Sequence, residues 1–411
     1  MRDRSGILAA TIAATALLAW RPVCGAPPAP QNASMLPPLA LHAGATLPAI
    51  AVNRQGDVFV AWAQETRIYT AIYVEVFRQG RWEMLGASAT GQGISSDHGT
   101  ALAPSIALDS RGNPAIAWQD LSAGNDQVYF RHWDGTSWDE LDGSATGLGV
   151  SNTVTLYARN PSLALDPHDS TVIAWEQHYG SRADVWARRD AQNLLHRGWK
   201  DFGAHPGILP YPEKLSVASH VALRLNKEGD PSVAWMDTET GPEQVYFRRW
   251  TGREWEELAG SGSPGGVSHA ADGAASVNLE IDMAGNPILS WKEGDGPKAL
   301  LRVMQWNGKR WTAVGDPPAE VGSNPTWPCL ALDAHGRPVV AYRAGKEIRV
   351  RRWNGKAWDR LGSANWRDPS AYTIPAKRLL ALATGAGKAC VAWVEADATP
   401  EIRTACFSLE E

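Results

Sequence analysis

The chain has 411 residues, of which 44% are hydrophobic and 20% charged, and its formal net charge is −5. These fractions are typical of a soluble globular protein. Charges of both signs are interspersed and no basic stripe is present, which argues against a nucleic-acid partner. The compositional outlier is tryptophan, with 20 copies.

The N-terminus has the pattern of an export signal. A basic start precedes an apolar run from Gly6 to Trp20, and the small residues around Ala26 offer a cleavage site. The run is short for a membrane span and no later segment reaches that length, so we expect no membrane-spanning helix. We predict a signal peptide at residues 1–26, a Pro- and Ala-rich tether at 27–35, and a secreted or periplasmic mature protein.

Three cysteines remain after the predicted cleavage: Cys329, Cys390 and Cys406. An odd number leaves at least one of them unpaired within the chain. Cys390 and Cys406 fall on neighbouring predicted strands, so they could form a disulfide or stay as buried thiols. No Cys/His spacing is typical of a zinc site.

A short pattern recurs seven times along the chain, at intervals of 51 to 60 residues. Its signature aromatic, usually preceded by alanine, falls at Trp62, Trp118, Trp175, Trp235, Trp291, Tyr342 and Trp393. Each copy has two turn signals. The first is D-x-x-G-x-P, as at Asp109–Pro114, and the second is a glycine between two Trp-containing runs, as at Gly135. Each copy therefore predicts two hairpins, or four strands, and no helical periodicity follows the signal segment.

Seven four-stranded antiparallel copies predict an all-β fold, a seven-bladed β-propeller. Residue size agrees, because the first two strands carry small side chains such as Ala115 and the last two carry large ones such as Trp133, as a wedge-shaped blade requires. The seventh copy has only three strands. We predict that residues 36–44 supply its outer strand and close the ring, making residues 36–411 a single domain. A solenoid is the alternative, but it would need polar caps at both ends.

Three runs carry a family resemblance: ALDSRGNPAIAW, QVYFRHWDGTSWDEL and GLGVSN. They resemble the Trp-rich propeller repeats of exported bacterial proteins, which are loosely grouped with sialidase-like, Asp-box propellers. The W-D-G-x-x-W hairpin is also similar to that of tryptophan-rich lectin propellers, which bind sugars between blades. The resemblance covers residues 45–411 and implies the propeller fold. Ala107 and the D-x-x-G spacing depart from the Asp box, and the lectin sugar-binding residues have no position-by-position match, so no site residue is transferred.

Two sets of carboxylates recur in the copies. Asp109 and its equivalents precede the first turn, where aspartate usually bonds the backbone of the turn itself. The second set follows the signature aromatic and consists of Asp120, Glu176, Asp237, Glu293 and Glu395. We expect these side chains at one mouth of the channel. There they could bind a cation such as calcium or an amino sugar, supply an acid/base pair for glycoside hydrolysis, or be ordinary surface charges.

The linkers between copies should open on the same side. They bring Asp97, His98, Asn152 and His269 toward this mouth, although their repetition also fits a structural motif. Arg159 begins an inner strand and could reach the mouth as well. Tyr157 and Glu176 could be a nucleophile pair of the sialidase kind.

The near-equivalent copies distribute similar groups around a ring, which suits recognition without catalysis. We therefore predict an exported, monomeric, non-catalytic propeller that binds an extracellular glycan or an envelope protein. No cofactor and no metal site is predicted, apart from a cation such as calcium at the mouth. One alternative is a sialidase-like glycoside hydrolase or lyase that uses the acidic mouth, and another is a cell-envelope assembly scaffold. The fold does not decide among them.

Overall fold

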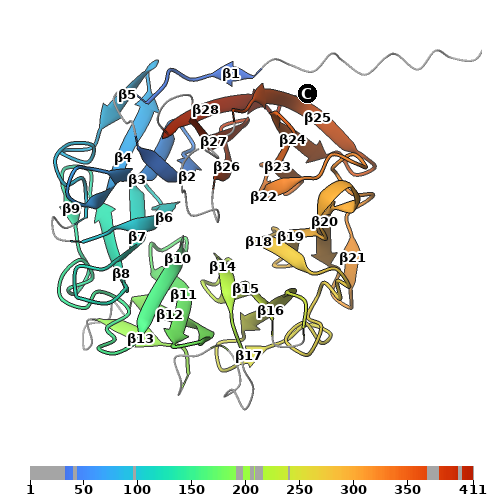
Figure 1. The fold of residues 1–411 in the computed structure, drawn as a ribbon, viewed down its shortest axis with the longest axis horizontal. Helices are drawn as coiled ribbons and strands as arrows, with labels where there is room; N and C mark the ends of the chain where they lie inside the picture. Colours follow the sequence, from blue (N-terminus) through green and yellow to red (C-terminus); the bar gives the residue numbers. More distant parts are fainter. Residues whose placement is uncertain are drawn as a thin grey trace, which may run out of the picture.

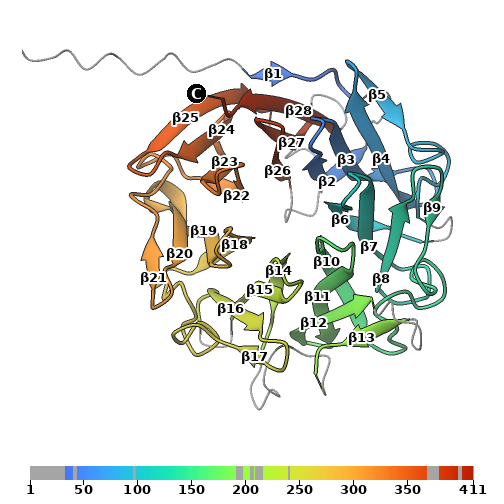
Figure 2. The same ribbon diagram turned by 180° about the vertical axis from the view of Figure 1, so that it is seen from behind.

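The computed structural model describes residues 33–39, 44–95, 99–190, 198–203, 208, 216–238, 241–367, 379–396 and 400–410. The predicted signal peptide and most of the predicted tether lie outside these ranges. The described chain forms seven four-stranded antiparallel sheets around a central axis (Figures 1 and 2). This confirms the predicted all-β, seven-bladed propeller.

In the first three blades the strands pair in chain order, so the first strand of each blade lies at the axis. Blade 1 consists of β2 (Ala45–Val52), β3 (Val58–Glu65), β4 (Thr70–Arg78) and β5 (Arg81–Met84). Blade 2 consists of β6 (Leu102–Leu108), β7 (Pro114–Asp120), β8 (Gln127–Trp133) and β9 (Trp138–Asp139). Blade 3 consists of β10 (Tyr157–Leu165), β11 (Thr171–Tyr179), β12 (Arg182–Asp190) and β13 (Trp199–Asp201).

Blades 4 to 6 follow the same order. Blade 4 consists of β14 (Ser219–Leu225), β15 (Pro231–Asp237), β16 (Gln244–Trp250) and β17 (Trp255–Glu256). Blade 5 consists of β18 (Ala274–Ile281), β19 (Pro287–Glu293), β20 (Leu300–Trp306) and β21 (Trp311–Ala313), with a single 3-10 turn, η1 (Gly296–Lys298). Blade 6 consists of β22 (Thr326–Leu332), β23 (Pro338–Ala344), β24 (Glu347–Trp353) and β25 (Trp358–Asn365). Nothing in the described ranges is a helix long and apolar enough to cross a bilayer.

Blade 7 closes the ring with a strand from the other end of the chain. Its strands are β26 (Leu380–Gly385), β27 (Lys388–Ala396), β28 (Pro400–Ser408) and β1 (Ser34–Met35). β1 lies outermost and pairs with β28 in the register Ser34↔Cys406 and Met35↔Ala405.

The closing strand lies just before the predicted segment at residues 36–44, so its predicted position was wrong. Pro37 and Pro38 have no backbone N–H, and they end the strand soon after it begins. Of the predicted segment, the structure describes residues 36–39 and 44, and none of these lies in a strand. Leu36 N donates to Thr404 O of β28 (3.0 Å), and Gly44 N donates to Pro400 O of β28 (2.9 Å).

Cys390 and Cys406 form a disulfide between β27 and β28, where they are directly opposed residues. Of the two states predicted for these cysteines, a disulfide or buried thiols, the structure has the disulfide. Because Cys406 also pairs with Ser34 of β1, the disulfide lies at the point of ring closure. Cys329 is a half-buried thiol that is in no disulfide within the described residues, and its Sγ donates to Leu380 O (3.2 Å).

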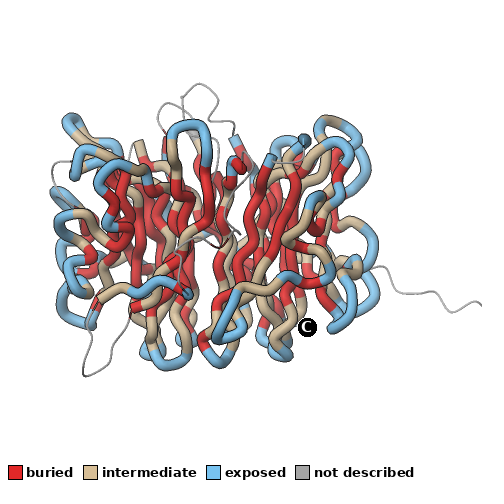
Figure 3. The backbone as a smooth tube through the Cα atoms, turned by 90° about the horizontal axis from the view of Figure 1, so that it is seen from below, coloured by how far each residue is buried: buried red, intermediate tan, exposed pale blue. Residues whose placement is uncertain are grey.

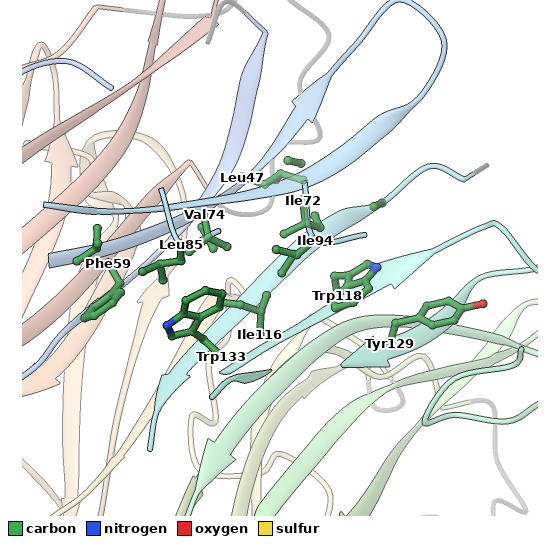
Figure 4. Packing of buried hydrophobic residues seen from close by; sticks show 14 residues of the cluster. Leu47, Phe59, Ile72, Val74, Leu85, Ile94, Ile116, Trp118, Tyr129 and Trp133 are labelled. Atoms are coloured by element: carbon green, nitrogen blue, oxygen red, sulfur yellow. The ribbon is translucent and has the colours of Figure 1, made fainter. Parts of the chain in front are cut away.

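The seven signature aromatics form the core between blades, each with no more than 2% of its surface exposed. Figure 4 shows this packing between blades 1 and 2, where Trp118 lies beside Ile72 and Ile94. Farther out, Trp133 and Trp138 lie with their ring centroids 5.7 Å apart at the rim. The second strands of the blades, such as β3 and β15, are buried over most of their length, outer strands such as β5 and β13 are partly exposed, and the loops are exposed at both ends of the molecule (Figure 3).

Each first hairpin of blades 1 to 6 is closed by the same side-chain bonds. Asp109 Oδ1 accepts the backbone N–H groups of Arg111 (3.0 Å) and Asn113 (2.7 Å). The equivalent pair of bonds recurs at Asn53, Asp166, Asn226, Asp282 and Asp333. These residues close turns, which is the structural role that aspartate and asparagine fill well.

The glycine-rich linkers have a structural function of their own. β9 pairs only with His132 and Trp133, which leaves the rest of the outer edge of β8 without a partner strand. The following linker covers this edge, with hydrogen bonds from Phe130 N to Ser144 O (2.9 Å) and from Val150 N to Val128 O (2.7 Å). The linkers after blades 1 and 4 make the equivalent bonds to β4 and β16.

Candidate active site

At one end of the channel, here called the mouth, the first strands begin and the second strands end. The first strands of blades 1 to 6 each contain a bulge there, at which the register shifts. One residue of each bulge has a positive φ, namely Leu47, Ala103, Asn160, His220, Ser276 and Trp327. A bulge re-aims side chains, and three of these six residues line the central cavity. An axial cavity of about 200 Å³ is lined by all seven first strands and includes His220, Ser276 and Trp327.

The five predicted mouth carboxylates do not form one ring. Glu176 directly follows its signature aromatic, whereas Asp120, Asp237, Glu293 and Glu395 stand two positions after theirs. Because side chains alternate along a strand, Glu176 lies on the opposite face of its blade from the other four.

Asp120 and Asp237 are buried, and each accepts hydrogen bonds from residues of a nearby loop at the mouth. Asp120 is 1% exposed and accepts the Ser122 backbone N–H (2.9 Å). Burial raises the pKa of Asp120 above its ordinary value, although hydrogen bonds from Ser122 oppose the shift. Asp237 accepts the Val217 backbone N–H (3.1 Å) and the Ser216 hydroxyl. Both carboxylates are therefore occupied by protein donors.

The remaining two acids of this set are ion-paired. Glu293 binds Arg302 through both carboxylate oxygens, at 2.9 and 3.1 Å. Glu395 lies between Arg403 (3.1 Å) and Arg367 (3.6 Å). Each carboxylate is neutralised by arginine.

The predicted linker residues contribute less to the candidate site than residues of the inner strands do. Asp97 and His98 lie outside the described residues. Asn152 and His269 are exposed and adopt positive φ angles of 49° and 44° on the linkers after blades 2 and 4. Their backbone N–H groups bond to Leu148 O (3.0 Å) and Gly265 O (3.1 Å).

Blade 3 carries a different cluster at the mouth. Tyr157 and His178 are directly opposed on β10 and β11, and the next pair on the same face is Arg159 with Glu176. Cβ atoms of such partners lie about 4.5–5.5 Å apart. The Arg159 guanidinium lies 5.3 Å from the Tyr157 ring centroid, and His178 Nε2 lies 3.2 Å from Glu176 Oε2. We call Tyr157, Arg159, Glu176 and His178 the blade 3 cluster.

Glu176 is the buried centre of the cluster. It is 1% exposed, and besides His178 it accepts the Asn160 side-chain N–H (2.9 Å) and the His220 backbone N–H of blade 4 (2.7 Å). In blade 2 the same position is Gln119, whose Oε1 accepts the Asn160 backbone N–H of blade 3 (3.2 Å). A neutral amide can therefore accept the backbone N–H of the neighbouring bulge, and the second oxygen of Glu176 is the one that contacts Asn160 and His178.

The other three members of the blade 3 cluster reach solvent. Tyr157 is 41% exposed, and the side chains of Arg159 and His178 are 41% and 22% exposed. Asp126 of blade 2 binds Arg159 at Nε (2.5 Å), and the Arg159 side chain stays partly exposed. A base, a phenol and a cation thus meet on one solvent-accessible face.

Sequence reasoning named Arg159 and Glu176, considered Tyr157 only as a nucleophile, and missed His178 and His220. The signal for the missed residues was a departure from the repeat. His220 occupies a bulge position where other blades have Leu47, Ala103 or Ser276. No group of three or more His, Cys, Asp or Glu side chains suited to a metal is found in the described part of the chain.

No protein-family model matches the sequence, and neither does any curated protein. Solved structures do match. One is a polysaccharide lyase of family PL25, an ulvan lyase bound to -[GlcA(1-4)Rha3S]-, with a TM-score of 0.56 and 12% identity over 92% of this chain and 96% of the lyase. A second polysaccharide lyase has a TM-score of 0.54 and 10% identity over 90% of this chain and 91% of that one. A GH93 α-L-arabinofuranosidase of Fusarium graminearum has a TM-score of 0.51 and 12% identity over 77% of this chain and 96% of that one.

These matches correct the prediction of a non-catalytic binding propeller. The three propellers most relevant to the fold are carbohydrate-cleaving enzymes, so the enzyme alternative is better supported than the binding one. At these identities the likeness itself concerns the fold. The sialidase-like resemblance stays a prediction.

Proposed function

We propose that this protein is a polysaccharide lyase that cleaves a uronate-containing polysaccharide by β-elimination at the channel mouth. The observation that carries the proposal is the blade 3 cluster, in which a histidine, a tyrosine and an arginine share one accessible face. The two lyases of the same fold support this choice of reaction, and one of them was solved with a glucuronate-containing ligand.

β-Elimination makes three demands on a site. A base removes the proton on C5, next to the uronate carboxylate. The C4–O glycosidic bond breaks as the C4=C5 double bond forms, and an acid protonates the departing oxygen. A cation must also offset the negative charge that develops on the carboxylate during proton removal.

His178 is the proposed base. In the tautomer that donates Nε2–H to Glu176, Nδ1 carries the free lone pair that accepts the C5 proton. The Glu176 carboxylate then stabilises the imidazolium that forms, in the manner of a base held by a buried acid. This gives the carboxylate of Glu176 a function that the amide of Gln119 could not provide.

Tyr157 and Arg159 supply the other two functions. The Tyr157 phenol lies across the strand pair from His178 and protonates the leaving oxygen. Arg159 binds the substrate carboxylate, since a guanidinium matches a carboxylate with two parallel hydrogen bonds. Asp126 holds Arg159 at Nε and directs its terminal nitrogens.

A retaining or inverting hydrolase fits less well. Such enzymes need two carboxyl groups about 5–9.5 Å apart that are open to the sugar. Among the described mouth acids, Asp120 and Asp237 are buried against protein donors, and Glu293 and Glu395 are paired with arginine.

The test is an assay of the purified chain on a panel of uronate-containing polysaccharides. The expected product has a conjugated C4=C5 double bond, which is read by ultraviolet absorbance. H178Q and Y157F should each lower kcat by about 100-fold or more, the range for loss of a general acid or base. H168Q, in an exposed turn at the other end of blade 3, is the matched control and should leave kcat unchanged.

E176Q separates catalysis from structure at the same cluster. Because glutamine already fills this position in blade 2, E176Q should keep the wild-type melting temperature while kcat falls with little change in KM. Products without the double bond, or an H178Q variant with wild-type kcat, would overturn the proposed function.

A further inference from the structure

Blade 6 places a tryptophan, Trp327, on the wall of the axial cavity that His220 also lines, and an arginine lies against this tryptophan. Trp327 lines this cavity from the bulge of β22, with a φ of 49°. A bulky side chain at positive φ is uncommon and strained. Other blades place Ala103 or Ser276 at the same bulge position, so the bulge itself does not require tryptophan.

Arg343 on the neighbouring strand β23 is stacked against this group. Its guanidinium lies 4.0 Å from the Trp366 ring centroid and 5.4 Å from that of Trp327, and its Nε donates to Gly345 O (3.0 Å). Trp366 is fixed in turn, because it is 4% exposed and its indole N–H donates to Val394 O (3.1 Å). The cation is therefore held in one orientation before any ligand arrives.

Arg343 differs from other arginines of the mouth in its charge environment. Arg302 pairs with Glu293, and Arg349 pairs with Glu320. Across the described ranges no carboxylate forms an ion pair with Arg343, whose neighbours are aromatic rings and a carbonyl group. Arg343 is thus a half-buried cation that contacts a residue lining the cavity and forms no ion pair within the described residues, and such a cation can bind the anion of a ligand.

We infer that Trp327 and Arg343 form a second sugar subsite that binds an anionic pyranose of the polysaccharide. The apolar face of the sugar stacks on the Trp327 ring, and a carboxylate or sulfate on the same unit binds Arg343. This inference rests on the proposed function for its choice of an acidic polysaccharide. His220 contacts Glu176 and lines the same cavity as Trp327, so a chain held at the blade 3 cluster crosses the mouth toward blade 6.

The test measures binding, independently of cleavage, by isothermal titration. The probe is a defined oligosaccharide of the -[GlcA(1-4)Rha3S]- repeat, used as native, desulfated and carboxyl-reduced material. Titrations use the H178Q background, which should prevent turnover. W327A should weaken binding of the native probe by about tenfold or more, and W327F should restore most of it, because stacking needs only an aromatic ring.

R343Q should weaken binding of the native probe by about tenfold, the range for a hydrogen bond to a charged group. If Arg343 binds the sulfate, R343Q should not weaken binding of the desulfated probe. If Arg343 binds the carboxylate, R343Q should not weaken binding of the carboxyl-reduced probe. R310Q, an exposed arginine in the rim turn of blade 5, is the matched control and should bind as the parent does.

The outcomes for the subsite and for the proposed function are distinct. If the wild type binds without cleaving and R343Q loses affinity, the subsite stands and the lyase proposal falls. If the wild type cleaves while folded W327A and R343Q keep Kd and KM within twofold, the subsite falls and the lyase proposal stands. A wild type that binds none of the three probes also overturns the subsite.

Discussion

Two aspartates of blade 2 have pKa values shifted in opposite directions by their surroundings. Burial raises the pKa of Asp120, whereas backbone hydrogen bonds from Ser137 and Thr136 lower the pKa of the exposed Asp134 to about 2. A raised carboxyl pKa means that the folded state favours the protonated form. The stabilising contribution of Asp120 is therefore complete below its unfolded pKa and is lost as pH rises through the folded value. For Asp134 the contribution is present above the unfolded pKa and is lost as pH falls toward 2.

The opposite pKa shifts of Asp120 and Asp134 predict opposite effects of their substitution on thermal unfolding at neutral pH. D120N should raise the melting temperature at neutral pH and reduce the gain in stability that the wild type shows on mild acidification, because asparagine still accepts the Ser122 N–H. D134N should lower the melting temperature at neutral pH and have a smaller effect in acid. Melting curves at several pH values measure both. A D120N variant that melts below the wild type at neutral pH would contradict the assignment.

The sequence identified part of the candidate site and missed the rest for a geometric reason. Periodicity predicted that residues after each signature aromatic reach the mouth, and Glu176 does. The one-residue offset of Glu176 from the position of Asp120 is visible in the sequence, and strand alternation places the two carboxylates on opposite faces, so the five acids do not form one set. His178 and His220 stayed hidden because their placement depends on strand register and on a bulge, which no local pattern announces.

At the level of elements, the recurring GLGVSN linker has a structural explanation. The sequence showed the repetition, but its function depends on the shortness of the fourth strands. Because β9 is so short, the linker completes the edge of β8 by backbone bonds. Gly149 approaches the strand closely, and a Cβ there would lie 2.4 Å from Val128 O at a φ of +60°.

Gly149 and Gly147 provide a matched pair of substitutions in this linker. G149A should destabilise the protein by about 2 kcal/mol or more, because the methyl group meets a backbone oxygen in addition to the positive-φ penalty. G147A has nearly the same φ, +57°, but faces open space, so only about 1 kcal/mol is expected. Urea unfolding midpoints measure the difference. Equal effects of the two substitutions would show that the close approach to β8 is unimportant.

For the whole molecule, the seven copies predicted the architecture, since a ring of four-stranded blades buries the signature aromatic of every copy between neighbouring blades. The residues of the proposed cluster and of the proposed subsite come from copies that break the pattern. Blade 3 provides Glu176 and His178, blade 4 provides His220, and blade 6 provides Trp327 and Arg343. A scaffold of near-identical wedges can tolerate such exchanges at the mouth, because the core positions of every blade remain filled.

The ring is closed by β1, a strand of two residues, so removing β1 tests how far the whole fold depends on ring closure. A chain that begins at Leu36 lacks β1, so the outer edge of β28 loses its partner at Cys406 and Ala405. The Cys390–Cys406 disulfide still holds β27 to β28, and Leu36 can still donate to Thr404. We therefore expect the shortened chain to fold, with a loss of about 1–3 kcal/mol from the missing strand bonds. The control chain begins at residue 27 and keeps β1.

Thermal unfolding and amide hydrogen exchange distinguish a local effect from a global one. If β1 closes the ring, the shortened chain should melt at a lower temperature, and exchange should accelerate first in β28 and then at the seam between blades 7 and 1. The residues at this seam include Ile50 and Cys390, which share one buried cluster. If the two chains melt together and β28 exchanges at the same rate in both, the packing of that cluster holds the ring closed and β1 merely covers an edge.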